Sequence, residues 1–133
     1  MKFLATLSLF AASAIAADWG KTCSGEVLDD TTGTLTAKCD TGDGQGTLSE
    51  TELDLYGCLK YSDGKISAPG GDGTFGDVCN DCTIYRLDDA LYGSLIPQRP
   101  WISCTCNGAS EPATLNLDIT SITNVFGVLV CSR

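Results

Sequence analysis

The 133-residue sequence contains no histidine and a single methionine, and it is poor in cationic side chains. Without histidine, neither a Ser-His-Asp nor a Cys-His catalytic group can be assembled, so we expect the protein not to be an enzyme. Eight lysines and arginines stand against 17 aspartates and glutamates, which gives a formal net charge of −9. Nucleic acids and anionic membranes are bound through clustered cations, so we expect neither as a partner.

Long apolar runs are also missing. Residues 1–16 place one lysine before a short apolar stretch that ends in Ala14-Ile15-Ala16, the pattern of a secretory signal peptide. The stretch is too short to span a bilayer, because a membrane helix needs about 20 apolar residues. We therefore expect a secreted, extracellular protein whose mature part, residues 17–133, forms a single domain.

Cysteine, in contrast, is abundant. All eight cysteines follow residue 16, and an even number in an exported chain predicts four disulfides. Zinc binding by Cys79-x-x-Cys82 with Cys104-x-Cys106 is the less favoured alternative, since the second spacing is tight for a metal site. We expect neither a metal nor a cofactor.

The rest of the chain is typical of an all-β protein. Glycines and Asn or Asp turns separate short segments rich in Thr, Leu, Ile and Val, and no segment after residue 16 keeps a helical period over three turns. The clearest alternating segments are 35–38, 53–55, 102–105 and 115–119. The clearest turns are Ser62-Asp63-Gly64 and Phe126-Gly127.

An internal repeat orders these segments. The first copy covers about residues 18–68 and the second about 74–131. The matched segments are Trp19-Gly-Lys-Thr-Cys23 with Phe75-Gly-Asp-Val-Cys79, residues 34–39 with 101–106, and Leu53-Asp-Leu55 with Leu117-Asp-Ile119. Neither copy alone is large enough to bury a good core, so we expect two interlocked halves that share one core.

The repeat also predicts how cysteines pair. Cys23 with Cys39 and Cys79 with Cys106 are equivalent pairs, and each would join the first strand of a half to its second strand. Closing a loop of about 15 residues stabilises a fold by about 3 kcal/mol in the chain-entropy model.

The other four cysteines have no counterpart of this kind. Cys104 lies two residues before Cys106 and so on the same face of its strand, and an antiparallel partner brings Cys82 opposite it after one bulge residue. Cys58 and Cys131 are left, and they would tie the first half to the end of the second. These pairs are predictions, because the spacing alone leaves other pairings open.

The repeated motifs resemble those of the cyanovirin-N homology (CVNH) domain, in particular its secreted fungal members. The resemblance covers residues 18–131. The motifs that carry it are Trp19-x-x-x-Cys23, Leu35-x-Ala37-x-Cys39, Leu53-Asp-Leu55 and Leu59-x-x-x-Asp63-Gly64-x-Ile66, with their second copies. The resemblance implies a cyanovirin-N-like fold, in which each of two pseudo-symmetric repeats forms a three-stranded sheet plus a β-hairpin. It also implies a lectin for mannose-rich glycans, with no catalysis and no cofactor.

The same resemblance implies two sugar pockets, one at each end of the molecule. The first would lie where the beginning of the first repeat meets the close of the second. Its residues would be Lys21, Thr22, Asp40, Thr41 and Asn124. In this sequence Gly42 replaces a hydroxyl residue of the family pattern and Phe126 replaces an aspartate.

The second pocket departs further from the family. Lys60 and Tyr61 stand where a carboxylate and an asparagine are usual, and Val78 stands where a threonine precedes the cysteine. Thr74 and Asn107 are the polar positions that remain, so we expect a weaker second site. The prediction is therefore one working site for oligomannose-like glycans.

An insertion in the second repeat suggests a different function. Residues 85–100 include Tyr85, Arg86, Tyr92, Leu95 and Arg99, and tyrosine and arginine are favoured at protein contact surfaces. This predicts, as an alternative, a secreted effector or interaction protein that keeps the fold but binds a protein partner through the 85–100 loop. The loop as a lid over the strands of the second repeat is the other interpretation. The glycine-rich connection 67–73 permits either a monomer or a domain-swapped dimer.

Overall fold

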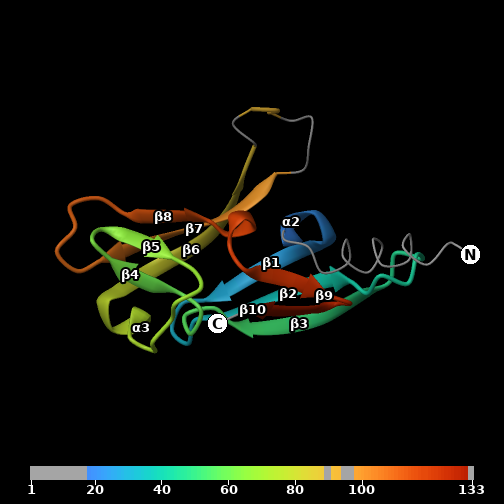
Figure 1. The fold of residues 1–133 in the computed structure, drawn as a ribbon, viewed down its shortest axis with the longest axis horizontal. Coiled ribbons are helices and arrows are strands. Elements are labelled where there is room, and N and C mark those ends of the chain that lie inside the picture. Colours follow the sequence, from blue (N-terminus) through green and yellow to red (C-terminus); the bar gives the residue numbers. More distant parts are fainter. Residues whose placement is uncertain (1–17, 89–90, 94–97, 132–133) are drawn as a thin grey trace, which may run out of the picture.

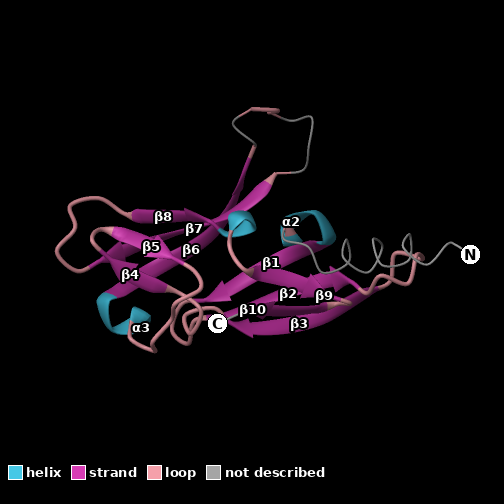
Figure 2. Cartoon of the chain, viewed as in Figure 1, coloured by secondary structure: helices cyan, strands magenta, loops and turns pink. Residues whose placement is uncertain are grey.

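A computed structural model describes the protein over residues 18–88, 91–93 and 98–131. The predicted signal peptide and parts of the 85–100 loop lie outside these residues. Within them the regular elements are ten β-strands and three single-turn helices, joined by loops (Figure 2). None of the helices in the described residues has the length and apolar content needed to cross a membrane.

The first half begins with the helical turn α2 (Trp19–Thr22) and continues into a three-stranded antiparallel sheet, then a hairpin. The strands are β1 (Cys23–Asp29), β2 (Thr34–Asp40) and β3 (Leu48–Asp54), followed by the hairpin strands β4 (Lys60–Ser62) and β5 (Lys65–Ser67). The predicted turn at Asp63-Gly64 connects β4 to β5, and both residues have positive φ.

The second half repeats this order. The helical turn α3 (Phe75–Val78) precedes the sheet of β6 (Cys79–Leu87), β7 (Arg99–Cys106) and β8 (Ala113–Asn116). A 3-10 turn η1 (Leu117–Ile119) then leads to the hairpin of β9 (Ile122–Val125) and β10 (Val128–Cys131). The alternating segment 115–119 is thus strand only as far as Asn116, whose side chain accepts a hydrogen bond from the backbone N–H of Asp118 and starts the 3-10 turn.

The two sheets match in register as well as in order. Cys23 pairs with Cys39 and Cys79 pairs with Cys106 at the same point of each sheet. A bulge follows at the same position, between Ser24 and Val27 in β1 and between Asn80 and Thr83 in β6. The internal repeat is therefore a repeat of three-dimensional structure.

Each hairpin covers the sheet of the other half. Hairpin β9–β10 packs along β3, and hairpin β4–β5 packs beside β8 (Figure 1). The first contact includes a hydrogen bond of 3.1 Å from the backbone N–H of Leu129 to the hydroxyl oxygen of Thr51. This exchange confirms the expected interlocked, cyanovirin-N-like architecture.

The core runs between the two halves. Trp19 and Phe75 hold equivalent positions in the repeats and are 0% and 1% exposed. Leu35 and Ile102, from the middle strands of the two sheets, are both fully buried. Trp101 is only partly buried and pairs with Asn116 in β8, so it does not join this core.

All eight cysteines are paired, as Cys23–Cys39, Cys79–Cys106, Cys82–Cys104 and Cys58–Cys131. Cys23–Cys39 and Cys79–Cys106 are the pairs that the repeat predicts, while Cys82–Cys104 agrees with the expected strand register and Cys58–Cys131 joins the two cysteines that were left. The sulfurs of the zinc alternative are consumed in these bonds. Cys82–Cys104 forms a second cross-link beside Cys79–Cys106 between β6 and β7. Cys58–Cys131 joins positions 73 residues apart and ties the first half to the end of the second.

Candidate functional site

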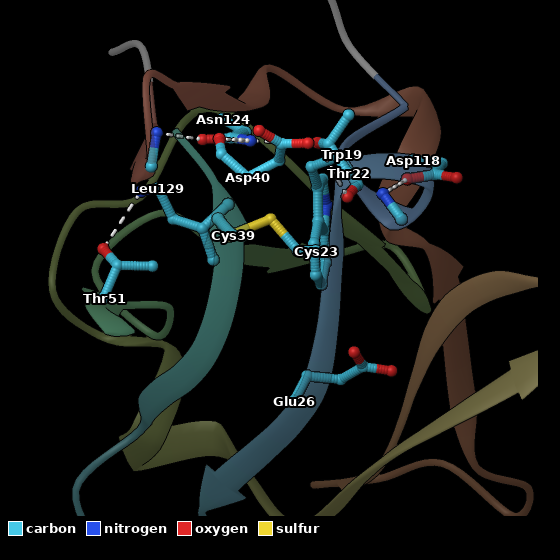
Figure 3. Close-up of a disulfide and its surroundings, with 12 residues drawn as sticks. Trp19, Thr22, Cys23, Glu26, Cys39, Asp40, Thr51, Asp118, Asn124 and Leu129 are labelled. Carbon is cyan, nitrogen blue, oxygen red and sulfur yellow. Dashed lines mark hydrogen bonds between the residues drawn. A yellow bond between two sulfur atoms is a disulfide. The ribbon is translucent and has the colours of Figure 1, made fainter. Parts of the chain in front are cut away.

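Asn124 organises the end of the molecule at which the first sugar pocket is expected. The residue is 4% exposed, and its amide nitrogen donates to the hydroxyl of Thr22 at 3.0 Å and to the carbonyl of Asp40 at 3.0 Å. Its amide oxygen accepts from the backbone N–H of Gly127 at 2.8 Å. Figure 3 shows Asn124 with Asp40 and Thr22 above the Cys23–Cys39 disulfide. We call Thr22, Asp40 and Asn124 the Asn124 cluster.

The cluster joins three separate parts of the chain. Thr22 closes the helical turn α2, Asp40 ends β2, and Asn124 lies in β9 of the exchanged hairpin. Both amide hydrogens of Asn124 and one lone-pair direction of its oxygen are already used within the protein. Asn124 therefore positions the loops around the site, and its amide has no hydrogen left for a ligand.

The loop after β2 supplies polar groups at the surface. One carboxylate oxygen of Asp40 accepts from the backbone N–H of Gly42 at 2.7 Å, which closes an Asx turn. The backbone N–H of Thr41 donates to the carbonyl of Thr47 at 2.9 Å, so the loop returns onto β3. Asp40 and Thr41 are partly exposed. Their side chains remain within reach of a ligand on a loop that is fixed by backbone bonds.

Phe126 forms the rim of the same site. It stands at the β9–β10 turn with a φ of 51° and is 54% exposed. A positive φ is costly for a bulky side chain, and here the turn is held by the bond from Gly127 to Asn124. A Cβ added to Gly42 would lie 3.2 Å from the Phe126 ring, so the glycine leaves room for the aromatic side chain. The rim is therefore apolar.

Lys21 completes the expected set. It precedes Thr22 in α2, its side chain is 48% exposed, and its ammonium lies 3.8 Å from a carboxylate oxygen of Asp18. At this separation and exposure the ion pair is weak. The structure thus brings all five expected residues to one end, with Lys21, Asp40 and Thr41 at the surface and the Asn124 amide beneath them.

The second, weaker sugar pocket is expected at the opposite end of the molecule. Thr74 and Asn107 are both exposed, and the hydroxyl of Thr74 donates to Asp72 at 2.6 Å. The backbone N–H of Asn107 donates to the carbonyl of Val78 at 2.8 Å, which joins the same two loops as in the first half. Val78 has no hydroxyl for a bond like that between Asn124 and Thr22. Among the described residues, no buried amide organises this end.

A second polar cluster was not anticipated from the sequence. Arg86, at the end of β6, reaches into the first half and donates to the Glu26 carboxylate at 2.8 Å, to the carbonyl of Cys23 at 3.0 Å and to the carbonyl of Gly20 at 3.0 Å. Although partial burial works in the opposite direction, the hydrogen bond from Arg86 holds the pKa of Glu26 below its usual range.

A neighbouring pair extends this cluster. The buried Asp118 carboxylate accepts from the backbone N–H of Gly20 at 2.9 Å and lies 3.3 Å from Arg99. Burial raises the pKa of Asp118, and the bond from Gly20 and the nearby guanidinium groups of Arg99 and Arg86 work against that rise. The signal that the sequence offered for this cluster is the presence of two arginines, Arg86 and Arg99, in the 85–100 insertion of an otherwise acidic chain.

The 85–100 loop is in part a continuation of β6 and β7, which extend away from the rest of the molecule (Figure 1). Arg86 anchors its base, and its guanidinium also donates to the carbonyl of Gln98 at 2.9 Å. Leu87, Leu91 and Tyr92 are exposed. Leu95 and its neighbours lie outside the described residues. The described part projects from the sheet and does not lie over its strands as a lid.

Comparisons with known proteins agree with this architecture. The model of the family described as "CVNH domain" matches residues 19–130. No protein with a curated description matches the sequence.

Solved structures with the same fold include a designed cyanovirin-N homolog lectin, with 25% identity, a TM-score of 0.62 and coverage of 86% of this chain and 98% of that one. Microvirin, solved as a complex with mannobiose, has 26% identity, a TM-score of 0.61 and coverage of 87% and 99%. The CVNH protein of Gibberella zeae has 24% identity, a TM-score of 0.66 and coverage of 87% and 98%. By the family match over nearly all of its described length, the chain belongs to the CVNH family.

Proposed function

We propose that this protein is an exported lectin that binds oligomannose-type glycans without chemical change, through the Asn124 cluster and the residues around it. The observation that carries the proposal is the bonding of Asn124 to Thr22, Asp40 and Gly127, which fixes three loops in one arrangement. Microvirin, a structural relative at 26% identity, is described in complex with mannobiose, which supports a mannose-type ligand.

The chemistry of the site suits a sugar. Sugar hydroxyls need donors and acceptors that are already held in place, because each net hydrogen bond contributes only about 1 kcal/mol. Lys21 offers a donor, Asp40 offers its carboxylate acceptors, and Thr41 offers a hydroxyl. The Phe126 ring offers an apolar face for the C–H side of a sugar. One shallow site of this kind gives modest affinity.

A single site also limits avidity. Thr74 and Asn107 at the opposite end lack a buried organising amide, so we infer that this end contributes little to binding. Linking two sites raises apparent affinity without any new contact. A monomer with one working site should therefore bind a branched glycan hardly better than it binds a small fragment of the same sugar.

The test is an NMR titration of the disulfide-bonded protein with mannobiose. We expect the backbone amides of Lys21, Thr41, Gly42 and Phe126 to shift, with dissociation constants in the micromolar to millimolar range (order of magnitude). The double variant Lys21→Ala, Asp40→Asn should abolish these shifts, and Asn107→Ala should leave them unchanged. Absence of shifts at millimolar sugar, or shifts confined to the Asn107 end, would contradict the proposal.

The alternative function is recognition of a protein by the 85–100 loop. Leu87, Leu91 and Tyr92 are exposed on it, and tyrosine is enriched in contact surfaces. Two results together would favour this alternative. The wild-type protein would bind no glycan, and replacing residues 88–97 with a short turn would abolish its binding to a protein partner.

A further inference from the structure

The second sheet, formed by β6, β7 and β8, has one face in the core and one face open to solvent. Successive residues of a strand point to opposite faces. In β7, Ile102 and Cys104 are buried, while Trp101, Ser103 and Thr105, which alternate with them, are exposed or half-buried. The strand register adds five residues to the open face, Asn80, Thr83, Tyr85, Thr114 and Asn116, and none of these is buried. We call these eight residues the outer face of the second sheet.

Tyr85 and Trp101 lie side by side on this face. They are directly paired between β6 and β7, and Asn116 continues the same row on β8. Opposite residues of an antiparallel pair have their Cβ atoms about 4.5–5.5 Å apart, with both side chains on one face. The next row consists of three hydroxyl residues, Thr83, Ser103 and Thr114. The outer face thus combines an aromatic pair with a band of hydroxyl and amide groups.

The polar groups of the two aromatic side chains are available to a ligand. Among the residues that the structure describes, neither the indole N–H of Trp101 nor the hydroxyl of Tyr85 has a hydrogen-bond partner, and the three hydroxyl residues of the next row have none for their side chains. The buried Trp19, in contrast, donates from its indole nitrogen to the carbonyl of Leu117 at 3.3 Å. The two tryptophans therefore differ in role, since one completes the core and the other keeps a free donor at the surface.

The first sheet shows what the other repeat carries at the same positions. Residues 34–39 match residues 101–106, and the equivalent disulfides lie at the same point of both registers. Two rows therefore correspond, namely Asp29, Thr34 and Asp54 in the first sheet and Tyr85, Trp101 and Asn116 in the second. The counterpart of Asp54 is thus Asn116, two residues before the Asp118 that the sequence motif indicates.

The two faces differ in charge. The charged residues on the open face of the first sheet are Asp29, Lys38, Asp40, Glu50, Glu52 and Asp54. The outer face of the second sheet, as defined above, has none. Arg99 and the bulge residue Asp81 border it, and Arg99 is paired with Asp18 and Asp118. In a chain with a formal net charge of −9, this uncharged sheet face is complementary to a neutral ligand.

We propose that the outer face of the second sheet binds a β-linked chain of glucose or N-acetylglucosamine units, whose rings stack on Tyr85 and Trp101. In such a chain every ring substituent is equatorial, so both faces of each ring are flat and consist of C–H groups. An aromatic side chain covers a surface of this kind well, and the neighbouring hydroxyl and amide groups bind the hydroxyls at the ring edge. Mannose has an axial hydroxyl at C2 and is the poorer ligand here.

This site goes beyond the proposed mannose-type site and does not depend on it. The Asn124 cluster is built from α2, β2 and β9, and the outer face of the second sheet is built from β6, β7 and β8. The two sites have no residue in common. Each can therefore be titrated and altered without the other.

The experiment follows the two indole N–H signals of the disulfide-bonded protein by NMR. Trp101 is the reporter, and the buried Trp19 is the internal control. The probes are cellopentaose and chitopentaose, and β-1,4-mannopentaose serves as a control of equal length and linkage that differs from cellopentaose in the C2 hydroxyl. We expect at least one of the two probes to shift the Trp101 signal and the amides of Thr83 and Ser103, with a dissociation constant on the order of a millimolar. The tighter of the two identifies the sugar, and β-1,4-mannopentaose should bind several-fold more weakly at these signals.

Variants test the aromatic pair. Tyr85→Asp with Trp101→Thr gives the second sheet the residues of the first and should abolish the shifts of Thr83 and Ser103. Trp101→Phe keeps a ring and should bind within about threefold of the wild type, since rings of both kinds stack. Thr34→Ala, at the position that corresponds to Trp101 in the first sheet, should leave the affinity unchanged. Thermal unfolding checks that each variant is folded.

Three results would overturn the proposal. The first is an unchanged Trp101 signal at millimolar cellopentaose and chitopentaose. The second is equal binding of cellopentaose and β-1,4-mannopentaose, because the flat ring would then have no role. The third is a concentration-dependent dimer that Trp101→Phe or the double variant disrupts, which would make this face an interface between two copies of the chain. Mannobiose binding at the Asn124 cluster should be the same in all these variants, so the result is independent of the mannose-type proposal.

Discussion

Asn124 and Thr22, which lie 102 positions apart in the chain, are joined by a hydrogen bond of 3.0 Å at the meeting point of the two halves. The bond fixes the last hairpin against the first helical turn. The candidate glycan site therefore depends on correct exchange of the hairpins, and folding and binding are linked at one side chain.

Replacing Asn124 with alanine should destabilise the fold as well as the site. The variant loses three hydrogen bonds and leaves the backbone N–H of Gly127 without its acceptor, a loss of about 2–3 kcal/mol. Urea unfolding measures this directly. Asn107→Ala, at an exposed position at the opposite end of the molecule, should change the unfolding free energy by less than about 0.5 kcal/mol. Equal stability of both variants would contradict the organising role of Asn124.

Phe126→Gly should separate stability from binding. Glycine relieves the positive φ but gains freedom in the unfolded chain, so we expect the unfolding free energy to change by less than about 1 kcal/mol. Affinity for mannobiose should fall by about threefold to tenfold, since covering an aromatic face contributes on the order of 1 kcal/mol. Phe126→Tyr keeps the ring and should retain affinity. If Phe126→Gly binds mannobiose as well as the wild type does, the Phe126 ring does not contribute to sugar binding.

The disulfides should contribute unequally. Cys58–Cys131 cross-links positions 73 residues apart, and removing it with two alanines should cost about 4 kcal/mol in the chain-entropy model. Cys82–Cys104 closes only a small additional loop beside Cys79–Cys106, so its removal should cost about 2 kcal/mol. Chemical denaturation of the two double variants compares them. A larger loss of stability on removing Cys82–Cys104 than on removing Cys58–Cys131 would show that strain or denatured-state structure outweighs loop entropy.

Glu26→Gln should lower the free energy of unfolding at neutral pH and make this free energy less sensitive to acid. The pKa of Glu26 is lowered in the folded state, so its contribution is complete above about pH 4.5, the ordinary value, and is lost as the pH falls through the folded pKa. We expect a loss of about 1–3 kcal/mol at pH 7 and a smaller difference from wild type at pH 3. Thermal unfolding across this range, with Glu111→Gln as the control, measures both. A difference that stays constant with pH would place the effect outside the ion pair with Arg86.

Gly71→Ala should disturb the connection between the halves. A Cβ at this position would lie 2.0 Å from the carbonyl oxygen of Gly57, so residues 70–72 must move away from residues 57–58. We expect a lower unfolding temperature and a larger fraction of domain-swapped dimer, measured by size exclusion with light scattering. Ser67→Ala, at an exposed position in the same connection, should keep the unfolding temperature and the dimer fraction of the wild type. A monomer of unchanged stability would show that the connection adjusts without strain.

Much of the fold can be predicted from the sequence because the two repeats carry the same pattern of cysteines and apolar residues. The cysteine spacings fix the register of β1 with β2 and of β6 with β7, and the same pattern assigns Cys82 to Cys104. The 3-10 turn at Leu117–Ile119 was expected as strand, because alternation alone does not show that the Asn116 side chain captures a backbone N–H. Local patterns predict which strands form, while side-chain capping decides where they end.

The candidate site was predicted as a set of residues but not as an arrangement. Lys21, Thr22, Asp40, Thr41 and Asn124 do meet at one end. The sequence does not reveal that Asn124 faces inward, because its partners come from α2, β2 and the β9–β10 turn.

The exchanged hairpins also bear on how such a chain could arise. A single copy of the repeat would leave the core face of its sheet uncovered, because the hairpin that covers it comes from the other copy. A one-copy ancestor would accordingly have been obliged to form a homodimer with reciprocal hairpins. Gene duplication and fusion would then have turned that symmetric assembly into one polypeptide, and left each copy free to diverge.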